Sequence, residues 1–169
     1  MTTLAIEEFK ANAIFRLDES FRMIQIACSK ITPAQLWLRP VDNGMSLGNQ
    51  LLHSAGNMRQ YIVSSLGETK DNRQRNKEFS TLEGATIAQL LENLKNTVEQ
   101  AKQIIRSAPE AHFLKKRHVQ GFSMSGIGVV LHAVEHFSYH TGQIAFWVKQ
   151  LTKEDLGFYS GIDLTQNND

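Results

Sequence analysis

Four stretches of this 169-residue chain repeat apolar residues at steps of three and four, which is the spacing of one face of an α-helix. They cover approximately residues 4–30, 46–66, 87–108 and 124–151. All three prolines, Pro33, Pro40 and Pro109, fall between these stretches, where helix-breaking residues belong. No stretch alternates polar and apolar residues between hairpin turns, so the sequence predicts an all-α protein.

Two of the predicted helices carry recognisable end signals. Ser46 is suited to cap the start of the second helix, and Gly67 is suited to end it. Thr86 and Gln89 have the spacing of a capping box at the start of the third helix. Four long amphipathic helices in a chain of this length predict a single-domain four-helix bundle.

The connection between the second and third helices is long, polar and charged, and it covers about residues 67–85. Fully extended, it could span about 60 Å, whereas a helix of some twenty residues is about 30 Å long. The connection is therefore long enough to cross the whole bundle and to let the second and third helices run parallel. A simple up-down-up-down path would not need this length.

The cysteine content and the balance of charges indicate the compartment of the protein and the classes of partner that it does not bind. The single cysteine, Cys28, lies in the apolar stripe of the first helix, so we interpret it as a buried side chain in a reducing compartment. With 18 basic and 17 acidic residues, the chain gives no case for nucleic-acid or membrane binding. The basic cluster at 115–118 is interpreted as a solvated loop. No targeting or membrane-spanning segment is visible, so we expect a cytoplasmic protein.

Three of the six histidines, His132, His136 and His140, recur every four residues in the last predicted helix. Residues four apart share a helix face, so two imidazoles can bind one ion, and a third from a neighbouring helix leaves a position open for water. At about 100° per residue, His136 and His140 lie at the edge of the apolar stripe, while His132 lies closer to solvent, at the mouth of such a site. The alternative is that these histidines are hydrogen-bonded core residues without a metal.

His53 is harder to place from periodicity. It shares the polar face of the second helix with Asn49, Asn57, Gln60 and Ser64, and this pattern predicts that it is exposed to solvent. The alternative is that this polar face lines a wet pocket. Asn57 and Gln60 would then support metal ligands or contact a substrate.

Two segments resemble the bacterial DinB-like superfamily, namely residues 46–57 and residues 132–144. The second is the more specific, because a histidine, three residues, a second histidine and then x-Gly-Gln-Ile near the end of the last helix is a family hallmark. The Leu36-Trp37-x-x-Pro40 turn and the closing segment 156–160 are also similar to one branch of it. The resemblance covers nearly the whole chain except residues 67–85 and the last few residues.

The resemblance implies a four-helix bundle in up-down-down-up order with a long crossover between the second and third helices. It also implies a metal site made by His53 on the second helix and by His136 and His140 on the fourth, which reverses the expectation that His53 is exposed. Members of known activity are mostly thiol-dependent enzymes, including transferases that use bacillithiol or mycothiol and a maleylpyruvate isomerase. A low-molecular-weight thiol and a homodimer are expectations from this resemblance alone.

Three neutral imidazoles leave the full charge of a divalent ion available to acidify a bound water or a thiol. Such ligands suit zinc, nickel or iron, as well as copper. Tyr139 and Gln143 lie near the face of the predicted site and could orient a small-molecule substrate. Glu135 is expected to face solvent, so no catalytic base is identified.

These features predict a metal-dependent enzyme, either a thiol S-transferase or a hydrolase. One alternative is a non-catalytic bundle whose metal ion only joins the second helix to the fourth, as a stress-response or interaction module. Another is a metal-free bundle that acts through a dimer interface.

Overall fold

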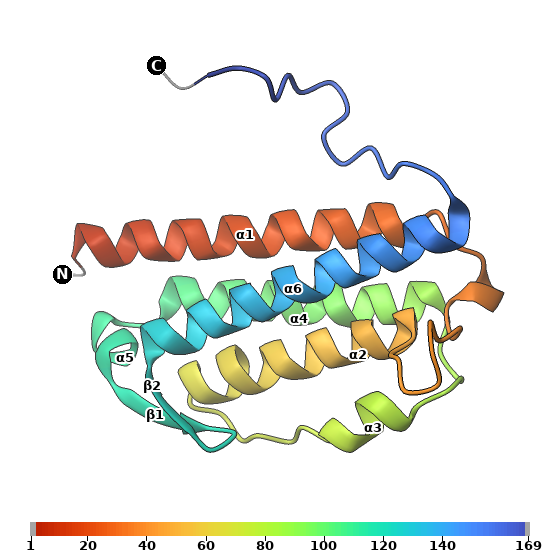
Figure 1. Ribbon diagram of the computed structural model, residues 1–169. Coiled ribbons are helices and arrows are strands. Elements are labelled where there is room, and N and C mark those ends of the chain that lie inside the picture. The colour runs from red at the N-terminus through yellow and green to blue at the C-terminus, as the bar shows by residue number, and fades with distance from the viewer. Residues whose placement is uncertain (1–2, 168–169) are drawn as a thin grey trace.

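The computed structural model describes residues 3–167, which form a helical bundle with one small two-stranded sheet (Figure 1). The main helices are α1 (Leu4–Cys28), α2 (Leu47–Met58), α4 (Ile87–Ser107) and α6 (Gly126–Thr152). Each of the four predicted helices is present, and the fold class is confirmed. Helix ends differ from the prediction by two residues or fewer, once the continuation of α2 is included.

The helices run in the up-down-down-up order. Figure 1 shows that α2 and α4 run in the same direction, opposite to α1 and α6. The chain returns from the end of α2 to the start of α4 along the outside of the bundle, as the long connection and the family resemblance had predicted. This order places α2 beside α6, where their facing side chains form the site described below.

Side chains from all four main helices meet in one core. Leu17 and Ile24 of α1, Leu51 of α2, Leu94 of α4 and Phe137 of α6 are each no more than 1% exposed. Burial of each such side chain contributes roughly 1.5–3 kcal/mol relative to leaving it in water. Cys28 is buried in the same core, and burial raises the pKa of its thiol to about 12, so it is an unreactive core residue.

The second helix continues beyond Met58 as a π-helical segment, Arg59–Leu66. The amide of Gly67 donates to the carbonyl oxygen of Ile62 at 3.0 Å, a bond that spans five residues instead of four. The helix therefore ends at Gly67, as predicted. Ser46 caps its start by accepting a hydrogen bond from the amide of Asn49 at 3.1 Å.

The connection 67–85 is more ordered than its polar composition suggested. It contains the short helix α3 (Arg75–Ser80), which packs against α2. The side-chain amide of Asn49 donates to the carbonyl oxygens of Glu78 and Thr81, at 2.9 and 2.7 Å. These bonds hold the crossover against the polar face of α2, so that face is covered by protein.

The expectation that the chain contains no strand was wrong. After the short helix α5 (Glu110–Leu114), strands β1 (Lys116–Val119) and β2 (Phe122–Ser125) pair antiparallel. Gln120 and Gly121 form the turn with φ angles of 53° and 84°, the left-handed region that two-residue hairpin turns require. Strands of four residues are too short to give a recognisable alternation.

The basic cluster at 115–118 is also corrected, because it belongs to this hairpin and is not wholly solvated. Arg117 is 8% exposed. Its guanidinium donates to the carbonyl oxygen of Ser65 at 2.7 Å and forms an ion pair with Glu68 at 3.3 Å. The hairpin is thereby fastened to the end of the second helix.

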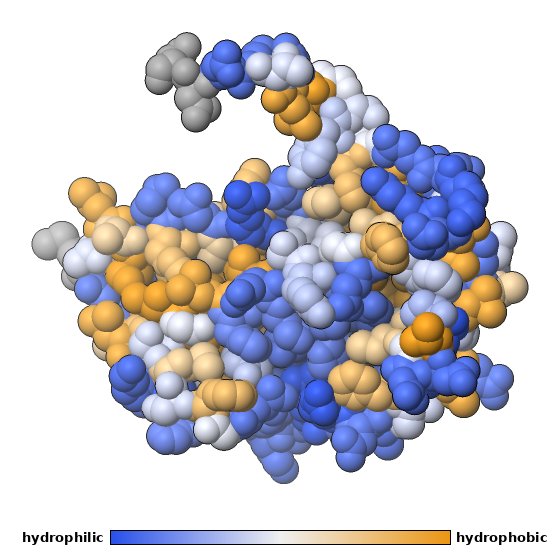
Figure 2. Space-filling view, viewed as in Figure 1, coloured by the Kyte–Doolittle hydropathy of each residue, from blue (hydrophilic) through white to orange (hydrophobic). Residues whose placement is uncertain are grey.

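The surface is uneven in polarity. Figure 2 shows hydrophobic residues gathered between the first halves of α1 and α6, and mainly hydrophilic residues over the middle of this face. Beyond α6 the chain leaves the bundle as a segment without helix or strand, anchored by the buried side chain of Leu156. Within residues 3–167, no helix combines the length and the hydrophobicity needed to cross a membrane.

Candidate metal centre

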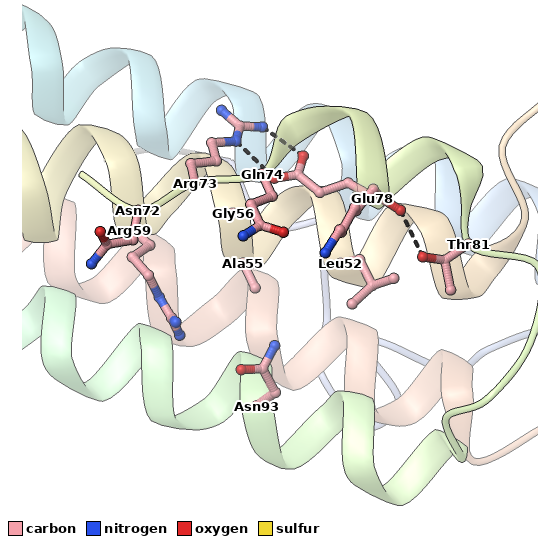
Figure 3. Close-up of a pocket in the computed structure, with 11 residues that line it drawn as sticks. Leu52, Ala55, Gly56, Arg59, Asn72, Arg73, Gln74, Glu78, Thr81 and Asn93 are labelled. Carbon is pink, nitrogen blue, oxygen red and sulfur yellow. Dashed lines mark hydrogen bonds and ion pairs between the residues drawn. The ribbon is translucent and has the colours of Figure 1, made fainter.

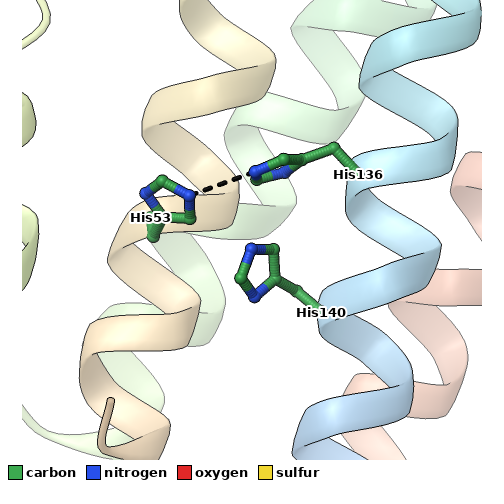
Figure 4. A group of neighbouring side chains, drawn as sticks. All are labelled: His53, His136 and His140. Atoms are coloured by element: carbon green, nitrogen blue, oxygen red, sulfur yellow. Dashed lines mark hydrogen bonds between the residues drawn. The ribbon is translucent and has the colours of Figure 1, made fainter. Parts of the chain in front are cut away.

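Three imidazoles face one another across the seam between α2 and α6 (Figure 4). His53 comes from α2, and His136 and His140 come from successive turns of α6. One nitrogen of each ring lies within 4.8 Å of the others, and the Nε2 atoms of His53 and His136 are 3.1 Å apart. The structure therefore brings together the three histidines that the family resemblance singled out.

His53 is only 6% exposed, so the prediction from periodicity that it faces solvent was wrong. The crossover covers it, and the ring of Phe79 from α3 lies 4.8 Å from its ring. A polar helix face is solvated only if no other segment packs on it. Here that segment is α3, whose position cannot be read from the repeat in α2.

The Nδ1 atom of His53 is held by a carboxylate from the crossover. Nδ1 lies 2.8 Å from Oε2 of Glu78, and because an ionised carboxylate can only accept, Nδ1 is the donor. In the neutral ring this leaves the lone pair on Nε2, which is turned toward the other imidazoles. Arg73 binds the same carboxylate with two bonds, Nε to Oε1 and Nη2 to Oε2, both 2.8 Å long. Burial raises the pKa of Glu78, but the bonds from Arg73 and His53 outweigh this effect and keep the pKa below its ordinary value.

His140 is oriented in the same way by a different acceptor. Its Nδ1 atom lies 2.5 Å from Oε1 of Gln50, and an amide oxygen can only accept a hydrogen bond. The proton of His140 is therefore on Nδ1, and its Nε2 carries a lone pair that points toward His53 and His136. Two of the three imidazoles are thus fixed in the tautomer that a metal ligand needs.

The cluster favours neutral imidazoles. Burial, followed by the neighbouring charges of His140 and His53, lowers the pKa of His136 to about 3. Burial and the nearby His53 lower the pKa of His140 to about 4. At neutral pH both rings therefore keep the lone pairs through which a cation binds.

Three pairs of polar side chains contact each other across the seam between α2 and α6, and two of them contain the metal-site histidines described above. The remaining pair is Asn57 and His132, whose Nδ2 and Nε2 atoms are 3.4 Å apart. His132 is half-buried and stacked on Tyr61 at 4.0 Å, and burial lowers its pKa. Within residues 3–167, Oδ1 of Asn57 is buried without a hydrogen-bond partner. The successive pairs along the seam are Gln50 with His140, His53 with His136, and Asn57 with His132.

The other candidate residues lie at different distances from the imidazoles. Gln60 accepts a bond from Arg73 at 2.9 Å and donates to Asp71 at 2.7 Å, so it supports the arginine rather than the histidines. The exposed ring of Tyr139 lies 5.2 Å from that of His140, and Gln143 is half-buried beside it. The roles of Asn57, Gln60, His132, Tyr139 and Gln143 toward a substrate stay predictions. Glu135 is exposed, as expected.

Sequence reasoning missed the three residues that orient the ligands. Gln50 precedes His53 by three positions and shares its side of α2, so helical spacing could have identified it. Arg73 and Glu78 lie in a charged connection and carry no local signal. Only the path of the crossover brings them to the site.

Behind the carboxylate lies a pocket of about 290 Å³ between α2, α3 and α4, lined mainly by polar and charged residues (Figure 3). Gly56 lies on its wall, and a Cβ atom at this position would overlap the carboxylate of Glu78. A glycine is therefore required for Glu78 to approach His53. The pocket is also lined by Leu52, Ala55, Arg59, Asn72, Gln74 and Asn93.

Comparison with known proteins gives a consistent result for family and fold. The sequence profile of the DinB family matches residues 16–168. A search of curated proteins found no match. Three solved structures share the fold at low sequence identity, as follows.

A conserved protein from Enterococcus faecalis superposes with a TM-score of 0.75 at 13% identity, covering 91% of this chain and 99% of that one. A DinB-like protein from Bacillus subtilis superposes with a TM-score of 0.64 at 15% identity, and the match covers 83% of this chain and 91% of that one. YfiT from Bacillus subtilis superposes with a TM-score of 0.67 at 18% identity, and the match covers 84% of this chain and 87% of that one. YfiT is described as a probable metal-dependent hydrolase with an unusual four-helix bundle topology. At these identities the similarity establishes the fold.

Proposed function

This chain belongs to the DinB family, and from that premise we propose that it is a metal-dependent enzyme whose His53, His136 and His140 hold one divalent ion. One observation carries the proposal. Glu78 and Gln50 fix the Nδ1 atoms of two imidazoles, so that the Nε2 atoms converge with the third ring at one point. Three nitrogen donors on one side of an ion leave positions for a small-molecule ligand.

The donor set fits zinc, nickel or iron. A bound ion of this kind supplies a Lewis acid that can bring the pKa of water or of a thiol toward neutrality. Glu78 orients His53 and contributes a negative charge, and Arg73 in turn holds Glu78 ionised. The lowered pKa values of His136 and His140 keep both rings neutral at physiological pH, so neither has to lose a proton before it binds the ion.

Two reaction classes follow, hydrolysis with activated water and transfer of a low-molecular-weight thiol to a small-molecule substrate. The description of YfiT as a probable metal-dependent hydrolase supports the first. The engagement of both oxygens of Glu78 by Arg73 and His53 supports the second, because this carboxylate is not free to act as a base toward water. A thiol acidified by the ion needs no such base.

X-ray absorption spectroscopy of untagged, zinc-loaded protein tests the proposal. We expect three imidazole nitrogens and at least one exchangeable oxygen ligand. Replacement of that oxygen by sulfur on addition of a low-molecular-weight thiol would identify the transferase. Four protein ligands without an exchangeable position would contradict an enzymatic role and would indicate an ion that only joins α2 to α6.

A further inference from the structure

We infer that a second, apolar pocket beside His140 binds the non-polar part of a small-molecule substrate, and that this part is an uncharged aromatic or branched apolar group with a hydrogen-bond acceptor. The pocket has a volume of about 310 Å³, which is within the range of small-molecule sites. It lies between the segment that precedes α2 and the last part of α6. Its lining residues are Pro40, Met45, Gln50, Gln143, Phe146 and Trp147.

The pocket is separated from the metal ligands by a single side chain. Gln50 lines the pocket and also accepts the 2.5 Å hydrogen bond from Nδ1 of His140. Gln143 lines the pocket from the α6 side, one turn after His140 and on the same side of the helix. A molecule in the pocket therefore contacts the amide that orients His140 and a second amide one turn further along α6.

The chemistry of the walls selects the ligand. Among the described residues, the lining contains four largely apolar side chains and two amides but no charged group. An ionic group placed there would lose hydration without gaining a counter-charge. Because the oxygen of Gln50 is engaged by His140, its NH₂ group is the free part, and it offers a donor to a carbonyl, ether or similar acceptor.

Two aromatic rings give the pocket its shape. Trp147 is anchored by the bond from its Nε1 atom to the carbonyl oxygen of Leu38 at 3.4 Å. Phe146 is 64% exposed, so its ring is available to a ligand. Flat walls of this kind favour stacking or edge contacts with an aromatic group.

Binding in this pocket does not require a metal, whereas its role as a substrate site rests on the proposed metal-dependent function. The two can be tested separately. Acetophenone is a suitable probe because it combines an aromatic ring with a neutral carbonyl, and benzoate is a matched probe that carries a negative charge. The readout is ¹H–¹⁵N NMR of the Trp147 indole and of the side-chain amides of Gln50 and Gln143.

We expect acetophenone to shift these three sets of signals with a Kd on the order of 1 mM, as for other fragments of this size, and benzoate to bind at least fivefold more weakly. Phe146→Ala should weaken acetophenone binding by about fivefold. Phe15→Ala removes the same side chain at 58% exposure from α1, outside the pocket, and should change nothing. His136→Ala should retain binding even if it loses the metal.

Three results obtained without a bound metal would overturn the inference. The first is the absence of shifts at these groups, and the second is equal binding of benzoate and acetophenone. The third is a protein that sediments with twice the mass of one chain, returns to a single chain in Phe146→Ala, and does not bind acetophenone. The pocket would then be an interface between two copies of the chain. In nickel-loaded protein, we further expect paramagnetic broadening of bound acetophenone. Binding without broadening would separate the pocket from the metal and refute its role as a substrate site.

Discussion

Replacement of Glu78 by glutamine tests how the crossover supports the metal centre. Glutamine has nearly the same shape, but its single amide oxygen cannot accept from both His53 and the two donors of Arg73. The 2.8 Å bond that fixes Nδ1 of His53 is therefore weakened or lost. Loss of such a partner of a metal-bound histidine typically lowers metal affinity by about 10- to 100-fold, or about 1.4–2.8 kcal/mol.

The same substitution also destabilises the metal-free protein. The side chain of Arg73 is only 3% exposed and would lose its counter-charge. Leaving one partner of a buried ion pair uncompensated costs about 3–5 kcal/mol, and we expect the lower end because glutamine keeps one acceptor. The two effects are separable, because zinc affinity and the stability of the metal-free protein are measured independently.

The assay is competition for zinc with a chromogenic chelator, together with urea unfolding in the presence of EDTA. Glu83→Gln is the matched control, since Glu83 lies exposed on the same crossover. Zinc affinity of Glu78→Gln within twofold of the wild-type value, at unchanged stability, would refute the view that this carboxylate orients His53.

Further predictions concern pH and two glycines. In metal-free protein, His136 and His140 keep pKa values of about 3 and about 4, against an ordinary value of 6.5. The unfolded chain therefore binds more protons in this window, and stability should fall as the pH drops below 6.5, by up to about 1.4 kcal/mol per pH unit for each histidine. Urea unfolding between pH 7.5 and 5 checks this, and a flat profile would contradict it. Gly56→Ala, whose Cβ would overlap Glu78, should weaken zinc binding at least about tenfold. Gly142→Ala meets nothing within 4 Å, so it should leave zinc binding unchanged and raise stability by up to about 1 kcal/mol in thermal unfolding.

The helices could be predicted from the sequence because their signals are local. The apolar repeat, the caps at Ser46 and Thr86 and the positions of the prolines each act within a few residues. The hairpin could not, because four-residue strands give no clear period and because one of its buried residues, Arg117, is charged. Its burial depends on the carbonyl oxygen of Ser65, which is distant in the sequence.

The candidate site was predictable only in part for the same reason. The spacing of His136 and His140 already placed them together on the inner edge of the last helix. Periodicity put His53 in solvent, and only the family resemblance indicated that it faces the same centre. Glu78, which orients His53, lies on the crossover and reaches the site because the crossover packs against α2. The crossover shows no helical periodicity, so the sequence contains no repeat from which this contact could be predicted.

The metal centre is tested most directly by the metal content of untagged protein. Inductively coupled plasma mass spectrometry should find about one zinc, nickel or iron ion per chain, and His136→Ala should lose it. His118→Ala, which removes an exposed histidine of β1, is the matched control and should retain the ion. Wild-type protein that holds no ion after reloading with each of the three metals, or a His136→Ala variant that holds as much as the wild type, would contradict the proposed centre.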